Sequence, residues 1–417
     1  MATRVEIFFR SRWVERPEHV AELEPGRLPA GFRAAAVATG SKPSGRLDVG
    51  ALACDADDAV SVALFTRNAV VGAPVKVSRR AQLDRLRAVV VNAGNANVGT
   101  GARGVEVAEA MTRAAAAGLG VEPARVGVAS TGIIGVQLDG DRIVGGVTAA
   151  VESLAAGGGA DFSEAILTSD RGPKLASLEV SLSSGTVILA AQAKGAGMIS
   201  PDFATMLCFV ETDAAVDHAT LERIVRGAAA GSFERITVDG QLSTSDSLFV
   251  FAGGGSGHAI APGGDDERVF TAALDALLRQ LALEILADGE GATRVARLLV
   301  TGPESALEPV ARAIGDSPLV KCALHGGDPN WGRILQAAGQ ALPEGSAALD
   351  LAIEGVALVK GGDDLELSPA DRDRLNEAMR GDEVEIRLEL PGGDAGGELF
   401  FCDLAEEYVR FNSEYAT

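Results

Sequence analysis

The segment from Lys194 to Leu207 holds the residues of this sequence that are best suited to covalent chemistry. It reads Lys-Gly-Ala-Gly-Met-Ile-Ser-Pro-Asp-Phe-Ala-Thr-Met-Leu, and Thr205 stands near its end. A threonine hydroxyl is a poor nucleophile unless a nearby amine takes its proton. A threonine made N-terminal by cleavage carries that amine itself, with a pKa of about 7.7–8.0 in reference peptides. For an Ala-Thr pair in isolation, the simpler interpretation is a strand-start threonine that satisfies backbone groups.

A predicted hairpin and a predicted strand must position this segment. Residues 178–182 and 186–193 flank Ser-Ser-Gly, a pattern typical of a β-hairpin, and the second strand would deliver Lys194. Residues 206–210 predict a further strand, so Thr205 would stand at a strand start. Other predicted elements are strands at 88–92, 126–129, 384–390 and 399–404, and helices at 105–118 and from 265 to about 288. This alternation favours an α/β protein.

Composition excludes several classes of function. The 417 residues suffice for two or three domain-sized cores, and 47% are hydrophobic, which argues against disorder. A net charge of −21 disfavours nucleic acid and anionic membranes as partners. The four cysteines form no CxxC pair and the four histidines have no ligand spacing, so we expect reduced thiols and no metal. Without a signal core or a membrane-length apolar run, we expect a soluble, cytoplasmic protein.

The segment containing Thr205 resembles a family signature. KGAGMISPDFATML is similar to the KGxGMxxPxMATML motif of the ornithine acetyltransferases, also called bifunctional glutamate N-acetyltransferases, with Phe203 in place of Met. These are relatives of the self-processing, N-terminal-nucleophile aminopeptidases. The resemblance runs from about residue 28 to the end of the chain. It includes, in family order, NAGNANVGTG at 92–101, STGIIG at 130–135, TSDRGPK at 168–174, DGEGAT at 288–293, DPNWGR at 328–333 and the tail from Tyr408.

The resemblance implies an architecture and a maturation step. The expected fold is a layered αββα-type sandwich with a smaller C-terminal α/β domain. Cleavage between Ala204 and Thr205 would divide the chain into an alpha chain, 28–204, behind an N-terminal extension, 1–27, and a beta chain, 205–417. The smaller subdomain would begin at about 265, and a substrate-binding tail would end the beta chain. The alpha and beta fragments would stay together in an oligomer of two or more of each.

The resemblance also implies a reaction. Thr205 would take acetyl from N2-acetyl-L-ornithine and pass it to L-glutamate by a ping-pong route in L-arginine biosynthesis. No cofactor is implied, and acetyl-CoA stays open as a co-substrate. Thr131 and Gly132 match the oxyanion hole, and Asn95 and Asn97 are expected to shape the loop beside it. The implied substrate-binding residues are Thr168, Lys194, Thr205, Glu290, Asn412 and Thr417. A cation at Lys194 suits a substrate carboxylate, and an anion at Glu290 suits an amine.

Several positions depart from the family pattern, and three other interpretations stay open. The departures include Glu234, Gln241, Leu242 and Ser245 in the stretch that aligns with SFNxITVDGDTSTND. They leave room for a paralogue that serves a specialised, β-lactam-type pathway. An aminopeptidase or amidase would use water where the transferase uses glutamate. A non-catalytic binding protein would keep its chain uncut.

Overall fold

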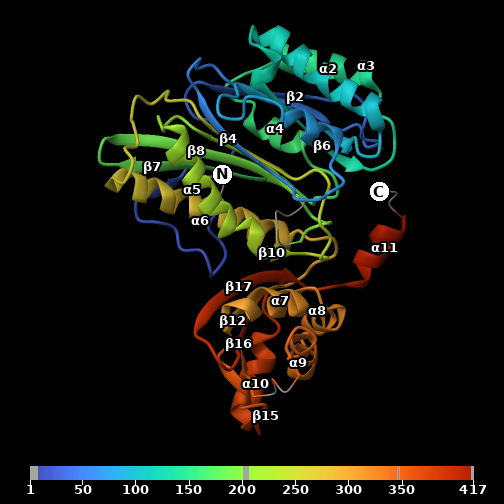
Figure 1. Cartoon of the computed structure of the whole chain (residues 1–417), viewed down its shortest axis with the longest axis vertical. Helices are drawn as coiled ribbons and strands as arrows, with labels where there is room; N and C mark the ends of the chain where they lie inside the picture. The colour runs from blue at the N-terminus through green and yellow to red at the C-terminus, as the bar shows by residue number, and fades with distance from the viewer. Residues whose placement is uncertain (1–7, 201–205, 345, 347, 415–417) are drawn as a thin grey trace, which may run out of the picture.

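The structure is a computed structural model that describes residues 8–200, 206–344, 346 and 348–414. Over these residues the chain forms a four-stranded, a six-stranded and a seven-stranded sheet. The first two lie face to face in the upper part of Figure 1, and the third forms a separate lower unit. The protein is therefore α/β, as the alternation of elements predicts.

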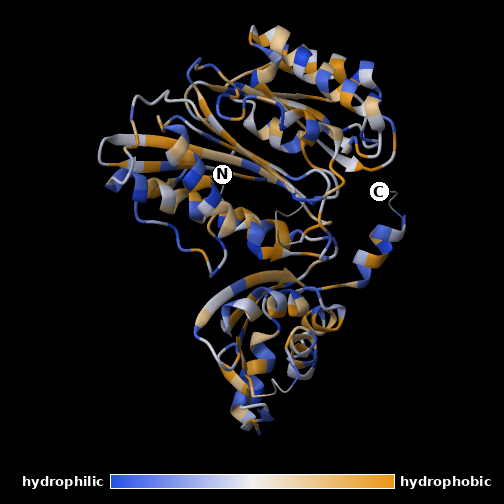
Figure 2. Cartoon of the chain, in the orientation of Figure 1, coloured by the Kyte–Doolittle hydropathy of each residue, from blue (hydrophilic) through white to orange (hydrophobic). Residues whose placement is uncertain are grey.

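The four-stranded sheet carries α1 (Ala73–Ser78), α2 (Gly101–Leu119) and α3 (Gly140–Glu152) on its outer face. Its order is β2 (Phe32–Val37), β3 (Val49–Cys54), β5 (Ala88–Asn95) and β6 (Val126–Ile133), with β5 and β6 parallel. Helices α2 and α3 pack on it beside the short α1. Their apolar stripes bury Met111 and Val147 against Val90 and Val128. Figure 2 shows α2 and α3 alternating between hydrophilic and hydrophobic residues, as half-buried helices do.

The six-stranded sheet is backed by two longer helices. Its order is β1 (Val20–Glu22), β7 (Lys174–Leu182), β8 (Gly185–Lys194), β9 (Leu207–Thr212), β11 (Ser247–Ala252) and β4 (Val60–Phe65). The predicted hairpin is β7 and β8, and the strand predicted after Thr205 is β9. Helices α5 (His218–Ala230) and α6 (Asp265–Ala287) cover the outer face through residues such as Leu221, Phe270 and Leu278.

Aromatic rings fill the space between the two sheets. Phe209 of β9 stacks on Phe249 of β11 with ring centroids 5.8 Å apart. Phe162 of α4 (Gly159–Ala165) contacts Phe209 edge-on at 5.1 Å. Such ring pairs contribute stability beyond that gained from burying their apolar area. The layers thus run from α2 and α3 through both sheets to α5 and α6, which is the predicted αββα sandwich (Figure 1).

The smaller unit is not one continuous segment from residue 265, because α6 belongs to the sandwich and the short strand β10 (Ile236–Thr237) comes earlier in the chain. Helix α6 belongs with the sandwich because its apolar face packs on β7 and β8. The seven-stranded sheet has the order β10-β17-β12-β16-β13-β14-β15 and a core of its own. Its strands are β10 (Ile236–Thr237), β12 (Val295–Gly302), β13 (Asp350–Ile353), β14 (Val356–Lys360), β15 (Asp363–Asp364), β16 (Glu383–Glu389) and β17 (Ala395–Cys402). Its helices are α7 (Glu304–Gly315), α8 (Pro318–His325), α9 (Trp331–Gly339) and α10 (Pro369–Ala378).

Segments near both ends of the described chain lie against or beside the sandwich. From Phe8 onward, the segment that the sequence sets apart as an extension packs on the sandwich: Phe8, Val14 and Val20 are buried, and β1 pairs with β7. The final helix, α11 (Glu406–Glu414), has no buried residue and projects beside the sandwich in Figure 1. Within the described part of the chain, no helix is long and apolar enough to cross a membrane. All four cysteines are free, and only Cys322 is exposed.

Candidate active site

Thr131 and Gly132 stand at the end of β6, where the backbones of β5 and β6 approach closely. Gly132 pairs with Gly94 and has φ 127°. A Cβ at Gly132 would lie 2.4 Å from the Gly94 carbonyl carbon, so no larger residue fits. Thr131 is buried, with 6% of its surface exposed. The strand end therefore holds a threonine hydroxyl and a glycine N–H next to each other.

Asparagines shape the loop beside this strand end, as predicted. Asn92 Nδ2 donates to the Asn95 carbonyl oxygen at 2.9 Å, and Asn95 Oδ1 accepts from Asn97 N at 2.8 Å. Asn97 has φ 53°, a left-handed conformation that asparagine tolerates better than most residues. Asn92 and Asn95 are still paired with β6, and their side chains add local hydrogen bonds where β5 ends. The loop then turns so that Ala96 lines the cavity described below.

Lys194, the last residue of β8, is buried and directed at Thr131. Its Nζ donates to Thr131 Oγ1 at 3.2 Å, and 3% of the residue is exposed. Burial lowers the pKa of Lys194, and the negative charge of Asp170 opposes that shift. In the sheet, Lys194 pairs with Leu207 of β9. The end of β8 thus lies beside the residues that follow the predicted nucleophile.

Asp170 connects three parts of the site. Its Oδ1 accepts hydrogen bonds from Gly195 N and Lys174 Nζ, both at 2.7 Å. Its Oδ2 accepts from Thr168 N at 3.0 Å and lies 3.9 Å from Lys194 Nζ. Burial alone would raise the pKa of Asp170, but the charges of Lys194 and Lys174 outweigh it and hold that pKa well below its usual range.

Glu290 lies just past the end of α6 and is held from both sides. Its Oε1 accepts from Ser169 Oγ at 2.8 Å, and its Oε2 accepts from Asn412 Nδ2 at 2.8 Å. Its backbone N donates to the Ala196 carbonyl oxygen at 2.9 Å. The carboxylate therefore faces the glycine-rich segment that leads to Thr205.

Helix α11 reaches the site through polar contacts. Besides Asn412, Tyr408 lies one turn earlier and donates from its hydroxyl to Asp239 Oδ2 at 3.3 Å. The Asp239 carboxylate also accepts from Met198 N at 2.7 Å and Ile199 N at 2.9 Å. Burial raises the pKa of Asp239, and these N–H donors oppose the shift. Met198 has φ 58°, so Asp239 stabilises a left-handed turn ahead of Thr205.

One cavity of about 170 Å³ brings the described candidate residues together. Its lining includes Thr131, Gly132, Thr168, Lys194, Glu290 and Asn412. Ala204, Thr205 and Thr417 lie outside the described residues. Met206, which follows Thr205, is buried, and its N donates to Asp246 Oδ1 at 3.1 Å. Among the described residues, no group of three or more His, Cys, Asp or Glu side chains is placed to hold a metal ion.

Sequence reasoning missed five residues, of which Ser169, Asp239 and Tyr408 line the cavity and two carboxylates lie behind the lining. They are Ser169, Asp170, Asp239, Asp246 and Tyr408. Asp170 stands within the Thr-Ser-Asp motif that contains Thr168, and Asp246 ends a Ser-Thr-Ser-Asp motif. Both aspartates could have been found from the sequence, because each stands in a motif whose other residues line the cavity. Tyr408 opens the tail that resembles the family and that also contains Asn412, so the same signal was present there.

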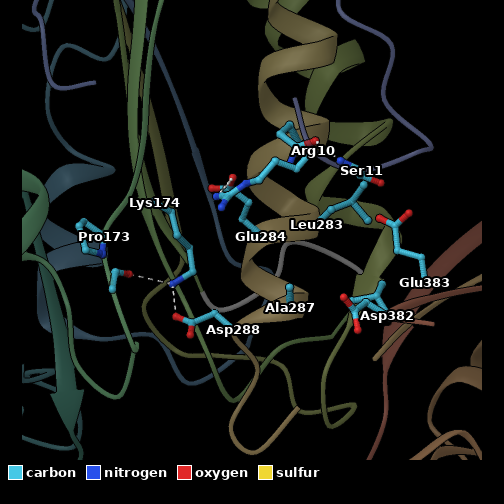
Figure 3. A pocket seen from close by; sticks show the side chains of 13 residues that line it. Arg10, Ser11, Pro173, Lys174, Leu283, Glu284, Ala287, Asp288, Asp382 and Glu383 are labelled. Atoms are coloured by element: carbon cyan, nitrogen blue, oxygen red, sulfur yellow. Dashed lines mark hydrogen bonds and ion pairs between the residues drawn. The ribbon is translucent and has the colours of Figure 1, made fainter. Parts of the chain in front are cut away.

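A larger cavity, of about 640 Å³, lies on the other side of the Asp170 network. Figure 3 shows Lys174 reaching Asp288 there, and the two are 2.5 Å apart. Arg10 and Glu284 form a second ion pair across it, at 2.7 Å. Neither Thr131 nor Gly132 lines it. Despite its size it lacks the threonine and glycine that were predicted to form an oxyanion hole, so we place the candidate active site in the smaller cavity.

The chain is similar to known proteins along most of its length. The model of the ArgJ family matches residues 33–417. The arginine biosynthesis bifunctional protein ArgJ of Symbiobacterium thermophilum is 42% identical over 396 residues, covering 93% of this chain and 98% of that protein. The protein of the same name from Gluconobacter oxydans is 40% identical over 429 residues, covering 100% of both. An ornithine acetyltransferase from Mycobacterium tuberculosis, solved with ornithine, is 35% identical, covering 44% of this chain and 98% of its own, with a TM-score of 0.41. With a family match over nearly the whole chain and relatives at this identity, the chain belongs to the ArgJ family.

Proposed function

We propose that this chain is an acetyltransferase of arginine biosynthesis that moves acetyl from N2-acetyl-L-ornithine to L-glutamate through an acetyl ester of Thr205. One observation carries the proposal. Thr131, Gly132, Lys194 and Glu290 line a single cavity next to the strand that Thr205 precedes. Membership in the ArgJ family and the names of its relatives support the same activity.

Maturation would come first. The Thr205 hydroxyl attacks the Ala204 carbonyl carbon, and the peptide C–N bond breaks as the acyl group moves from nitrogen to oxygen. Water then cleaves the resulting ester, which releases the Ala204 carboxylate and restores the hydroxyl. Thr205 now has a free amine whose ordinary pKa, about 7.7–8.0, suits proton transfer near neutral pH.

Acetyl transfer would use the same hydroxyl. The amine takes the hydroxyl proton as the oxygen attacks the acetyl carbonyl carbon of N2-acetylornithine. The Thr131 hydroxyl and the Gly132 N–H donate to the oxyanion that forms. The intermediate collapses, the C–N bond breaks, and ornithine leaves with the proton returned to its α-nitrogen. The α-amine of glutamate then attacks the Thr205 ester, which yields N-acetylglutamate and the free enzyme.

Charge in the cavity suits an acetylated diamino acid. Among its described lining residues, Lys194 is the cation, and Glu290 and Asp239 are the carboxylates. Asp239 accepts from backbone N–H groups, whereas Glu290 accepts from the side chains of Ser169 and Asn412, so we take Glu290 as the carboxylate that meets a substrate ammonium group. We assign the substrate carboxylate to Lys194 and the δ-ammonium to Glu290.

A second acetyl donor would form the same acetyl ester of Thr205. The printed name of the relatives, "bifunctional protein", favours two reactions. We extend the proposal to acetyl-CoA, whose thioester would acetylate Thr205 and so supply acetyl for glutamate without ornithine. No residue beyond those of the first reaction is required for the transfer step.

Mass spectrometry and a product assay test the proposal together. The unsubstituted protein should give two fragments, Met1–Ala204 and Thr205–Thr417, and Thr205→Ala should give one full-length chain. With acetyl-labelled N2-acetylornithine and glutamate, the label should appear in N-acetylglutamate. Release of free acetate at a similar rate without glutamate would identify an amidase instead. Full transfer by an uncut chain would overturn the mechanism, and failure to restore growth of an arginine auxotroph would favour a specialised pathway.

A further inference from the structure

Asp170 is a buried carboxylate outside the cavity lining, yet it contacts three segments that form the site. It lies between α4 and β7, and its side chain has no exposed surface. Its hydrogen bonds to Thr168 N and Gly195 N tie the loop of Thr168 to the end of β8. Lys174 bridges it to Asp288, two residues before Glu290. A buried carboxylate in purely apolar surroundings would not stay charged, so Asp170 depends on the charges of Lys174 and Lys194 to stay ionised.

The hydrogen bond from Lys194 to Thr131 has a consequence for the oxyanion hole. A hydroxyl has one proton to donate and lone pairs that accept. Because the Lys194 ammonium group can only donate, Thr131 Oγ1 must accept from it. The Thr131 proton is then free to point at another acceptor, and the adjacent positive charge makes it a stronger donor. Both effects disappear when Lys194 loses its proton.

The charged groups around Lys194 decide whether it keeps that proton. Asp170 favours the charged form most strongly, and Asp246 and Glu290 also favour it. Lys174 and Lys42 are positive and oppose it. Asp170 is the nearest of the carboxylates, with the 3.9 Å contact to Nζ. Lys174 is itself paired with Asp288, which limits its repulsion of Lys194.

We propose that Asp170 is a positioning residue of the acyl-transfer site, which keeps Lys194 charged and aimed at Thr131 so that the Thr131 proton is presented to the oxyanion. The inference rests on the proposed function. It goes further in two ways. Lys194 orients the Thr131 proton as well as binding a substrate carboxylate, and Asp170, which does not touch substrate, keeps Lys194 able to do so.

An Asp170→Asn substitution separates charge from shape, because asparagine keeps the size and one acceptor oxygen. In the cleaved enzyme, we expect kcat/KM for acetyl transfer to fall at least tenfold at about pH 8. We expect the alkaline limb of its pH profile to move down by at least one pH unit, since a buried lysine without its anion loses its proton more easily. A structural defect alone would lower activity without moving that limb.

A matched control uses another buried aspartate far from the cavity. Asp213 Oδ1 accepts from Ile188 N at 2.7 Å and Oδ2 accepts from Ala30 N at 3.3 Å, with no lysine paired to it. Asp213→Asn therefore removes a comparable backbone-binding charge. We expect it to leave the pH profile where it is in the unsubstituted enzyme.

A second measurement does not depend on cleavage or activity. The chain has only six lysines, Lys42, Lys76, Lys174, Lys194, Lys321 and Lys360, so their Nζ signals can be followed by NMR in the uncut Thr205→Ala protein. The Lys194 signal, assigned from its loss in Lys194→Met, should titrate at lower pH when Asp170→Asn is added. An unchanged titration midpoint, or an unmoved alkaline limb in an active variant, would overturn this inference. Absence of acetyl transfer by the unsubstituted enzyme would instead count against the proposed function.

Discussion

Gly197 and Glu290 lie so close together that a Cβ built on Gly197 would meet the Glu290 carboxylate carbon at 2.7 Å. Both carboxylate oxygens would lie within 2.8 Å of that Cβ. The absence of a side chain at residue 197 therefore determines where Glu290 can hold its carboxylate. Ser169 and Asn412 then fix the two oxygens in that place.

Gly197→Ala should displace Glu290 without breaking the fold. Gly197 does not have a positive φ, so alanine suits its backbone and the clash is with the side chain of Glu290. We expect KM for N2-acetylornithine to rise about tenfold, roughly the loss of one good hydrogen bond to a charged group. Steady-state kinetics measure this. Gly172→Ala is the control, because a Cβ there meets nothing within 4 Å; equal effects of the two changes would contradict the assignment.

Removing the Thr131 hydroxyl should lower the rate of the chemical step. Thr131→Val keeps the branched shape that β6 accommodates but loses the donor, and we expect kcat to fall by about 10²–10³. Thr131→Ser should retain most of the activity, because its hydroxyl can still accept from Lys194 and donate to the oxyanion. Single-turnover acetylation of the enzyme by N2-acetylornithine is the direct measurement. A valine variant with normal kcat would remove Thr131 from the oxyanion hole.

The pairing of Glu290 with the substrate's δ-ammonium can be tested from both sides. Glu290→Gln keeps the hydrogen-bonding shape and removes the charge, so KM for N2-acetylornithine should rise about 10- to 100-fold. N-acetylnorvaline lacks the δ-amine, so the same substitution should change its kinetics little. Measuring both donors with both enzymes gives the coupling between the two groups. An equal penalty for the two donors would place the ammonium group elsewhere.

Glu211 should make stability depend on pH. It is fully buried in β9, accepts from Gln192 Nε2 at 3.1 Å, and burial raises its pKa to about 8. An unfolded chain releases this proton at about pH 4.3. Between these values the folded state binds more protons at Glu211, so the contribution of Glu211 to the free energy of unfolding is fully present below the unfolded pKa and is lost as pH rises toward about 8.

Glu211→Gln removes that titration and should stabilise the protein on the alkaline side. We expect the melting temperature of the variant, relative to the unsubstituted protein, to increase from about pH 5 to about pH 8. Scanning calorimetry at matched ionic strength measures it. Glu222→Gln, on the exposed surface of α5, serves as the control with a small and pH-independent difference. A Glu211→Gln difference that stays constant across this range would show that Glu211 is charged in the folded protein.

Local patterns in the sequence predicted the strands and helices whose own apolar residues recur at a regular spacing. The apolar runs at 88–92 and 126–129 became β5 and β6, and the three- and four-residue spacing after 265 became α6. Those site residues of the family motifs that the structure describes also line one cavity. Such features depend on neighbouring residues, so a single segment carries enough information to predict them.

Features that depend on distant contacts could not be predicted in this way. The smaller unit was expected to begin at about residue 265, yet helix α6 starts there and its broad apolar face packs on β7 and β8. Residues 1–27 were expected to form an extension, yet Val20 to Glu22 pair with β7. The contacts of Asp170 join Thr168, Lys174 and Gly195 and arise only when β7 and β8 align.

The order of strands in the six-stranded sheet has a consequence for a chain cut after Ala204. Strands β9 and β11 come after the cut, whereas β8 and β4, their outer neighbours, come before it. The two polypeptides would be interleaved within one hydrogen-bonded layer. Neither could leave, or be exchanged with its counterpart from another molecule, without melting the sheet that carries both.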